Sequence, residues 1–501
     1  MNTMHEPSLS ANKPQALWKR VFALIGLPCL ISVAAIDPGN LEVDLQAGHL
    51  LGYRLIWALL LSSIIGFVLQ ALAARLTLRT GNHLAELCAK AYAHDRVLSL
   101  TIFAFAELSI VAFDLAEVVG TAIALQLLFG WPLWLGMILS ALDTMLVLYL
   151  QRRGLTTVEI LIEGMLFILA ACLIYEFALS RPSAAGMFYG TFVPTLGDRP
   201  QEAAILAIGI LGSVIMAHNL FLHSWLIKHR SLNDGPLLIP PTLASINDEC
   251  RYATIETAAI FFATFLINTI ALSVTAALPD KVLASIDEIG LRDAGALFRN
   301  FLPGEFASTA WGVALLASGH AATVTGTLAS QVVCEGFLDI REGSSPAGIV
   351  LATRAVAIIP ALAGALIAGQ EGADRLVVLS QVVLSLALPF VVIPLFKVLA
   401  VTEGEKGGGQ WLVRAGYVSF AVLIVSNGFA VAGIGAQVRE EAGGNSFPLI
   451  VLGSVVVVAV GLIVNLLQTP PQLEEIDLGV NRGSESAERS ALASEATSTY
   501  S

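Results

Sequence analysis

The amino-acid sequence predicts an all-α protein that crosses a lipid bilayer many times, and three observations lead to this fold class. Hydrophobic residues make up 56% of the 501 residues, charged residues only 13%, and the mean hydropathy is +0.77. Soluble globular domains do not reach such values. The apolar residues also gather in runs of about 20, the length at which an α-helix spans the hydrocarbon layer. Two of these runs are interrupted by polar residues, which is typical of membrane proteins built from inverted repeats.

Polar loops divide the apolar runs into about twelve expected transmembrane helices. In chain order these cover residues 18–50, 54–78, 97–129, 131–151, 155–180, 202–229, 252–278, 308–335, 347–369, 373–401, 410–437 and 446–468. Two amphipathic stretches, residues 82–93 and 280–301, are expected to lie outside the spans. Lysine and arginine are roughly twice as frequent in the segments that share a side with both termini, which predicts that both termini are cytosolic.

The interrupted runs divide the chain into a core and two accessory helices. They are spans one and six, so five spans separate equivalent positions. This predicts an inverted repeat of five helices, with a substrate site where the two broken helices meet. The expected parts are a disordered cytosolic N-terminus at residues 1–15, a core at 16–401 with repeats at about 16–180 and 201–401, two accessory helices within 409–468, and a disordered cytosolic tail at 472–501.

The first interruption is the tetrad Asp37-Pro38-Gly39-Asn40, about 17 residues into an apolar segment. A carboxylate at such a depth is costly in lipid and usually marks the path of an ion or a substrate. Proline removes a backbone donor and glycine permits non-helical angles, so the preceding carbonyl groups lose their helical partners. These carbonyls, with Asp37 and Asn40, would supply hard oxygen ligands to a cation. The alternative is a Pro-Gly turn between two ordinary helices, with Asp37 as an N-cap.

The second interruption, at residues 213–219, places the thioether of Met216 and the imidazole of His218 in an otherwise apolar span. Mg²⁺ and Ca²⁺ are bound by oxygen, whereas Mn²⁺, Fe²⁺ and later transition metals accept sulfur. The combination of Asp37, Asn40 and Met216 therefore favours a transition-metal ion. A methionine in a transmembrane helix is more often a packing residue. Met216 is a candidate metal ligand only because it lies in the second break.

Span three carries Glu107, Asp114 and Glu117, whose spacing places three carboxylates on roughly one helix face. Such a cluster cannot face lipid and commonly relays protons. The expected partners of these carboxylates are His218 and His223 on span six and Arg354 on span nine. The alternative is a fixed polar network that holds the helices together, and the two roles are compatible.

Three further polar residues within the spans are weaker candidates. Gln381 in span ten would add an oxygen ligand or serve as an interhelical hydrogen bond. Asn268 in span seven and His320 in span eight are equally compatible with polar residues that are satisfied inside the bundle.

Several other functional classes are disfavoured. Much of the net charge of −12 lies in loops and in the tail, so it does not indicate a nucleic-acid partner. The 5 cysteines are scattered singly and are interpreted as packing residues. The sequence has no phosphate-binding glycine loop, no HExxH and no nucleophile elbow. We therefore expect neither an enzyme nor a bound cofactor.

The tetrad and several other segments resemble the NRAMP divalent metal transporters. The two broken-helix segments, which begin Asp-Pro-Gly-Asn and Met-Ala-His-Asn, are the most specific. The likeness runs from about residue 37 to residue 395 and is carried by residues 37–42, 44–48, 70–76, 114–118, 216–224, 335–338, 354, 358–361 and 379–385.

The resemblance implies a LeuT-type bundle with a known arrangement of sites. Its implied metal ligands are Asp37, Asn40, Met216 and the backbone carbonyl of Ser213, with Gln381 approaching the metal in some conformations. Its implied proton routes run through Asp37, His218, Asp114, Glu117, Glu107 and Arg354. The family carries Mn²⁺ and Fe²⁺ into the cytosol with co-transported protons. The expected partners are therefore a divalent metal ion, protons and the lipid bilayer around a monomer.

Four positions depart from the family pattern. Ala217 replaces the usual proline between Met and His and restores a backbone donor, so we expect a milder break in span six. Ser213 stands where alanine is usual, and its hydroxyl is expected to bond the backbone or ion-bound water. His320 and Ala387 each replace a common glutamine. These changes leave the metal ligands intact and bear on transport rate, proton coupling and gating.

Three other functions share some of these features. A carrier of the same fold for Mg²⁺ or a trivalent ion is disfavoured by the sulfur of Met216. A non-transporting signalling receptor built on the fold usually has a large soluble C-terminal domain, whereas this tail has about 30 polar residues. A sodium-coupled amino-acid carrier is disfavoured by the carboxylate of Asp37, which would repel a substrate carboxylate.

Overall fold

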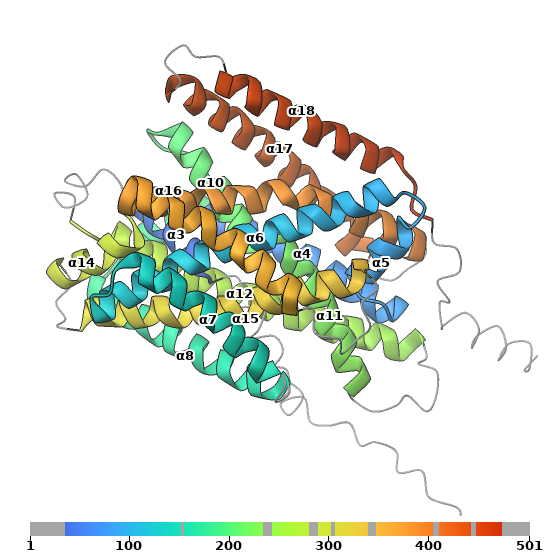
Figure 1. Ribbon diagram of the computed structural model, residues 1–501, viewed down its shortest axis with the longest axis horizontal. Coiled ribbons are helices and arrows are strands. Elements are labelled where there is room, and N and C mark those ends of the chain that lie inside the picture. The colour runs from blue at the N-terminus through green and yellow to red at the C-terminus, as the bar shows by residue number, and fades with distance from the viewer. Residues whose placement is uncertain are drawn as a thin grey trace, which may run out of the picture.

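The computed structural model describes residues 36–151, 155–233, 243–279, 289–301, 306–338, 347–403, 410–441 and 447–472. Within these ranges every regular element is a helix, so the all-α class is confirmed. Figure 1 shows long helices packed into a bundle, with α17 and α18 along one flank and α7 and α8 along the opposite flank.

The helices follow one another in an order that matches the expected spans. They are α3 (Pro38–Leu51), the 3-10 helix η1 (Gly52–Leu55), α4 (Ile56–Thr80), α5 (Leu84–Ala91), α6 (Arg96–Phe129), α7 (Leu133–Gln151), α8 (Leu155–Ser180), α9 (Ala184–Phe192), α10 (Pro200–Ile215), α11 (Ala217–Asn233), α12 (Leu243–Ala276), α14 (Leu291–Phe301), α15 (Ala307–Leu338), α16 (Ala347–Glu403), α17 (Gln410–Glu441) and α18 (Phe447–Gln468).

Eight helical segments in the described part of the chain are long and apolar enough to cross a membrane, with α3 and α4 forming one of them and α10 and α11 another. The shorter apolar stretches Leu351–Ile367 and Ser454–Gln468 accompany them, and α15, which corresponds to the eighth expected span, is not among the eight. Each expected span after the first has its helix. α16 carries two of these spans and turns at Gly369, where φ is 66°. The expected amphipathic stretches appear as α5 and α14. The first span is described only from residue 36, and residues 1–15, 280–288 and 473–501 lie outside the described residues.

The helices that carry the candidate residues form the centre of the bundle. In the most apolar stretch of α10 and α11, 89% of the residues are buried, and in that of α6 the share is 83%. In α8 and α17 the corresponding shares are only 22% and 24%. Lipid tails are as apolar as leucine, so α8 and α17 can face them without a polar outer surface. Polar groups on α6, α10 and α11 must instead be satisfied inside the protein.

The first break lies at Asp37, and its polar groups find partners inside the bundle. Asp37 has extended angles (φ −75°, ψ 167°), and its carboxylate accepts hydrogen bonds from the backbone N–H groups of Gly39 (3.0 Å) and Asn40 (3.1 Å). The hydroxyl of Ser318 donates to the carbonyl of Ile36 (2.6 Å). Asp37 is therefore an N-cap, as the alternative interpretation expected, and it is also a fully buried carboxylate.

The second break is a single residue wide. α10 ends at Ile215, α11 begins at Ala217, and Met216 between them has a φ of 37°. Such a left-handed value costs a residue other than glycine about 1–3 kcal/mol. The backbone N–H of Met216 still donates to the carbonyl of Gly212 (3.2 Å), and Met216 in turn accepts from the N–H of Asn219 (3.2 Å). The break in span six is thus narrow, and its strain is concentrated at Met216.

Candidate metal site and proton pathway

The two breaks meet at a direct hydrogen bond. Ser213 Oγ in the last turn of α10 donates to Asn40 Oδ1 in the first turn of α3 over 2.8 Å. Both side chains are fully buried. The Ser213 hydroxyl also lies 3.1 Å from the carbonyl of Ile210, so its single proton has a choice of two acceptors. Residues far apart in the sequence therefore form one polar centre.

Gln381 of α16 lies against both breaks. A methyl group on Gly39 would overlap the side-chain amide of Gln381, and a methyl group on Gly212 would overlap its backbone carbonyl. Gln381 Nε2 donates to Ser380 Oγ (3.0 Å). Its buried Oε1 has no hydrogen-bond partner among the described residues. Since an unpaired buried acceptor is costly, this oxygen is available to an additional ligand at the break.

Met216 is fully buried at the second break. Its sulfur accepts a hydrogen bond from Asn219 Nδ2 (3.6 Å), and its side chain packs in a cluster with Ala112 of α6. One helical turn further along α6, Ala116 borders Gly39 of the tetrad. Both breaks therefore lie against the same stretch of α6.

The donors at this centre are a carboxylate, side-chain amides, a backbone carbonyl and a thioether. In the part of the chain that the structure describes, no group of three or more His, Cys, Asp and Glu side chains is placed to hold a metal ion. A transition-metal site here would therefore combine Asp37 with neutral oxygen and sulfur donors, a mixture that Mn²⁺ and Fe²⁺ accept. The expected ligands that gather in this region are Asp37, Asn40, Ser213, Met216 and Gln381.

Two carboxylates of α6 form a buried network with Arg354 of α16. The guanidinium group of Arg354 makes two hydrogen bonds with the carboxylate of Glu117 and lies 3.1 Å from Asp114 Oδ1. Thr323 Oγ1 of α15 donates to Glu117 Oε1 (2.5 Å). The expected pairing of Arg354 with these carboxylates is therefore present, and it compensates charges that would be costly if buried alone.

The network adjoins the first break within the C-terminal half of α6, and a further carboxylate lies toward the N-terminal end of that helix. A methyl group on Gly120, just beyond the network, would overlap Pro38 of the tetrad. In the N-terminal half of α6, Glu107 accepts hydrogen bonds from Ser330 Oγ (3.4 Å) and Cys334 Sγ (3.5 Å) of α15. The three carboxylates of span three thus all face α15 or α16, as their spacing indicated.

The two histidines of span six are buried but lie outside this network. The ring of His218 packs against Phe113, with the ring centroids 4.7 Å apart. Neither ring nitrogen of His218 has a hydrogen-bond partner among the described residues, and the same is true of His223 Nδ1. His218 therefore lies beside the residue that precedes Asp114, but no hydrogen bond links His218 or His223 to the carboxylates of α6 within the described part of the structure.

The weaker candidates occupy other places in the bundle. Asn268 is fully buried in α12. His320 Nδ1 of α15 lies 3.0 Å from Asp143 Oδ2 of α7. Sequence reasoning missed Asp143, although a single carboxylate within the fourth expected span was a signal that could have found it.

Two buried carboxylates that directly follow the tetrad were also missed. Glu42 accepts hydrogen bonds from the backbone N–H of Leu291 (2.8 Å) and from Gln46 Nε2 (2.7 Å), so α3 holds the start of α14. Asp44 is fully buried, and neither of its oxygens has a hydrogen-bond partner within the described ranges. Their position in the first broken-helix segment was the available signal.

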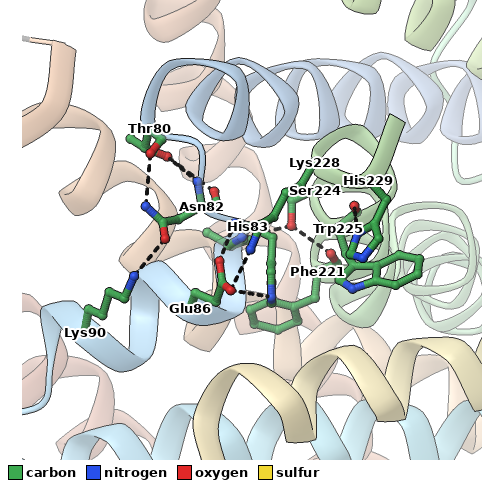
Figure 2. Close-up of polar contacts among 11 residues, drawn as sticks. Thr80, Asn82, His83, Glu86, Lys90, Phe221, Ser224, Trp225, Lys228 and His229 are labelled. Atoms are coloured by element: carbon green, nitrogen blue, oxygen red, sulfur yellow. Dashed lines mark hydrogen bonds and ion pairs between the residues drawn. The ribbon is translucent and has the colours of Figure 1, made fainter. Parts of the chain in front are cut away.

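A second polar network joins the surface helix α5 to the C-terminal half of α11 (Figure 2). The backbone N–H of Leu84 donates to Ser224 Oγ (2.9 Å), and Lys228 Nζ lies 2.7 Å from Glu86 Oε1. Glu86 also accepts from the backbone N–H of His83 (3.0 Å). Burial lowers the pKa of His83 to about 4. Burial acts to raise the pKa of Glu86, but His83 and Lys228 outweigh it and lower that pKa.

Comparisons with known proteins identify the family of the chain. A family model described as natural resistance-associated macrophage protein-like matches residues 29–433. The metal transporter Nramp6.2 of Populus trichocarpa is 40% identical over 386 residues, which cover 76% of this chain and 68% of that relative. The metal transporter Nramp6 of Arabidopsis thaliana is 41% identical over 386 residues, covering 76% of this chain and 71% of the relative.

A solved structure shares the fold. The Eremococcus coleocola manganese transporter, in complex with an aromatic bis-isothiourea substituted compound, matches with a TM-score of 0.77 and 27% identity over 91% of this chain and 94% of that chain. The matched range of the family model includes both breaks and Arg354. The chain therefore belongs to the natural resistance-associated macrophage protein-like (NRAMP) family and is a multi-pass metal transporter with the LeuT-type fold.

Proposed function

We propose that the protein carries Mn²⁺ and Fe²⁺ toward the cytosol together with protons, and that the ion is held where the two breaks meet. The proposed ligands are Asp37, Asn40, Met216, the backbone carbonyl of Ser213 and, in some conformations, Gln381. The observation that carries this proposal is the buried hydrogen bond between Ser213 and Asn40. This bond joins Asn40 of one break to Ser213 of the other. The likeness to a manganese transporter gives independent support.

The donor types favour a transition metal over harder cations. Carboxylate and amide oxygens suit Mn²⁺ and Mg²⁺ alike, whereas a thioether adds little for Mg²⁺. Asn219 Nδ2 contacts the sulfur of Met216 at 3.6 Å. Because a thioether is a weak acceptor, a metal ion would displace this contact at little cost. The sulfur is therefore the group that would separate Mn²⁺ from Mg²⁺.

The proton half of the proposal starts at Asp37. A carboxylate binds a metal ion in its deprotonated form, so ion binding at Asp37 expels any proton held there. The network of Glu117, Asp114 and Arg354 adjoins the tetrad and offers buried groups that can take up that proton. Glu107 continues the series of carboxylates along α6. His218, whose ring packs against Phe113 beside this series, is a further proposed participant.

The charge distribution supports a proposed orientation of the chain in the membrane. The excess of Lys and Arg supports cytosolic termini. α5 and its network with α11 would then lie on the cytosolic side, and α14, which Glu42 holds to α3, would lie on the opposite side. We propose that a monomer carries out transport, since both breaks and the carboxylate network come from one chain.

Uptake into proteoliposomes tests this function. We expect saturable Mn²⁺ uptake that rises when the external side is more acidic, and loss of uptake in Asp37→Ala. The matched control is Asp198→Ala, because Asp198 is an exposed carboxylate that pairs with Arg54 far from the breaks. Uptake that survives Asp37→Ala would reject the metal site. Uptake that ignores the pH gradient would reject proton coupling alone.

A carrier of harder ions is the second candidate, and Ser213 is the observation that favours it. The hydroxyl of Ser213 brings one more hard oxygen to within 2.8 Å of Asn40 Oδ1. If the hydroxyl proton turned to the carbonyl of Ile210, a lone pair would face a bound ion. Mg²⁺ that competes with Mn²⁺ at equal concentration would support this alternative.

A further inference from the structure

We propose that a basic cavity between α4, α12 and α17 binds the phosphate headgroup of an anionic phospholipid. The cavity has a volume of about 400 Å³ and is lined by residues of all three helices. Neither the metal site nor the carboxylate network contributes a residue to it. The inference is therefore independent of the proposed transport mechanism.

The charge of this cavity is the first observation. Arg75 of α4 and Arg251 of α12 line it, and none of the described lining residues is a carboxylate. Arg75 is buried at the wall, whereas Arg251 is exposed. Asn247, which also lines the cavity, accepts a hydrogen bond from Arg79 Nη2 (3.3 Å), so a third guanidinium group lies directly beside it. In a chain of net charge −12, such a local excess of cations selects an anionic ligand.

The depth of the cavity is the second observation. Arg75 lies in the last two turns of the apolar helix α4, Asn247 in the first two turns of α12, and Trp411 in the first turn of α17. The ends of membrane-spanning helices mark the boundary between hydrocarbon and water, where lipid phosphates lie. Trp411 is 60% exposed, and an exposed tryptophan at a helix end is typical of the interfacial belt.

The mixed lining distinguishes a lipid from a free anion. Ile255, one turn further into α12 than Arg251, lines the cavity and is 64% exposed, so an apolar surface continues from the basic part toward the membrane interior. Thr254, which also lines the cavity, adds a hydroxyl group to its wall. A free phosphate would use only the guanidinium groups. A phospholipid would place its phosphate on them and its acyl chain along Ile255 and the indole of Trp411.

Such a lipid would join the accessory helix α17 to the core. α17 packs on α4 beside the cavity, and the lipid would bridge α17 to α4 and α12 through the headgroup. The expected consequence is greater thermal stability of the full chain in anionic lipid. The ion-binding centre would be unaffected, because no residue of the cavity belongs to it.

The test uses the purified full chain and native mass spectrometry, with phosphatidylglycerol and phosphatidylcholine as probes. We expect retained phosphatidylglycerol and little phosphatidylcholine. Arg251→Gln should weaken phosphatidylglycerol binding about fivefold, the effect of one interfacial cation, and Arg251→Lys should retain most of it. The matched control is Arg199→Gln, because Arg199 is an exposed arginine that pairs with Glu202 at the start of α10.

Three results would overturn the proposal. One is equal retention of the two lipids, and another is unchanged phosphatidylglycerol binding in Arg251→Gln. The third comes from thermal melting with inorganic phosphate. If phosphate alone raises the melting temperature as much as phosphatidylglycerol does, the cavity takes a free anion and not a lipid. No stabilisation by phosphate, with stabilisation by phosphatidylglycerol, supports the lipid assignment.

Discussion

The two breaks at the centre of the bundle are built in different ways. The first contains Pro38 and Gly39, and Asp37 caps the helix that follows by accepting two backbone hydrogen bonds. The second contains neither proline nor glycine, and Met216 takes a left-handed φ of 37°. The first break therefore follows from its own residue types, whereas the second must be held by the residues packed around it.

The difference shows which contacts maintain the second break. Gly212 lets α10 approach the backbone of α16 at Gln381. Ser213 ties α10 to Asn40 of the first break, and Asn219 contacts the sulfur of Met216. The donors also differ, because the first break presents anionic and amide oxygens and the second presents sulfur and a backbone carbonyl. Changes at the second break should therefore alter packing and selectivity together.

The largest expected effect comes from Gly212→Ala. Its new methyl group would overlap the backbone carbonyl of Gln381, which cannot move as a flexible side chain can. We expect a loss of about 1–3 kcal/mol in stability, seen as a lower melting temperature, together with reduced Mn²⁺ uptake. Gly39→Ala at the first break should cost less stability, because its closest contact is the side-chain end of Gln381, which can move, and the fixed Cβ of Ala116 lies further away at 2.9 Å.

Gly164→Ala is the control for this pair, because nothing lies within 4 Å of the added methyl group in α8. It should be neutral or slightly stabilising, as expected for alanine in a helix. Equal losses of stability in Gly212→Ala and Gly39→Ala would show that the second break does not depend more strongly on its packing than the first.

The next effect concerns the sulfur. Met216→Ala should lower the affinity for Mn²⁺ about tenfold, or roughly 1.4 kcal/mol, and should raise competition by Mg²⁺, because the remaining donors are all oxygens. Competition uptake measures both quantities. Met165→Ala, which removes a partly buried thioether from α8, should leave the Mn²⁺ to Mg²⁺ ratio unchanged. An unaltered ratio in Met216→Ala would exclude the sulfur as a ligand.

A smaller effect is expected from Ser213→Ala. It removes the hydrogen bond between the breaks, which contributes about 1 kcal/mol. The apparent Mn²⁺ affinity should therefore fall about fivefold. Ser109→Ala is matched to it, because Ser109 Oγ makes the same kind of local bond, to the carbonyl of Ala106, without a partner in another helix. Similar affinities in the two variants would mean that the contact with Asn40 does not organise the site.

The smallest effect is a loosening of α5 from α11 in acid. The pKa of His83 is lowered from its ordinary value of 6.5 to about 4 when α5 is docked, so the undocked state binds the proton first. Docking is therefore most stable above about pH 6.5 and weakens as the pH falls toward 4. The lowered pKa of Glu86 acts in the same direction, because its protonation removes the ion pair with Lys228.

Hydrogen exchange of the α5 amides, corrected for the intrinsic rate, measures this loosening. Faster exchange between pH 6.5 and 4 is expected in the parent, and a flatter profile is expected in His83→Gln. Because α11 begins at the second break, undocking of α5 should affect that break more directly than the first. A pH-independent exchange rate in the parent would contradict the account.

The sequence predicted the first break more completely than the second for a physical reason. Pro38 and Gly39 favour a break in the helix through their own residue types, without help from distant neighbours. Polar residues located the second break and Ala217 predicted that it would be mild, but the φ of Met216 depends on neighbours that are distant in the sequence and could not be predicted. The spans were predictable because each apolar run must match the thickness of the bilayer.

Within the candidate site, charge complementarity predicted more than hydrogen-bond geometry. The pairing of Arg354 with Glu117 could be anticipated, since an isolated buried charge is costly. The ring of His218 instead packs on Phe113, and the contact of Glu42 with the N–H of Leu291 joins residues 249 positions apart. Neither could be inferred from spacing, because both depend on how whole helices are placed relative to one another.

X-ray absorption at the manganese K-edge of the Mn²⁺-loaded protein shows whether both breaks contribute ligands to the same ion. We expect a first coordination shell of oxygen donors with one sulfur, and loss of that sulfur in Met216→Ala. A shell of oxygen and nitrogen alone in the parent protein, or a spectrum that Met216→Ala leaves unchanged, would contradict this expectation.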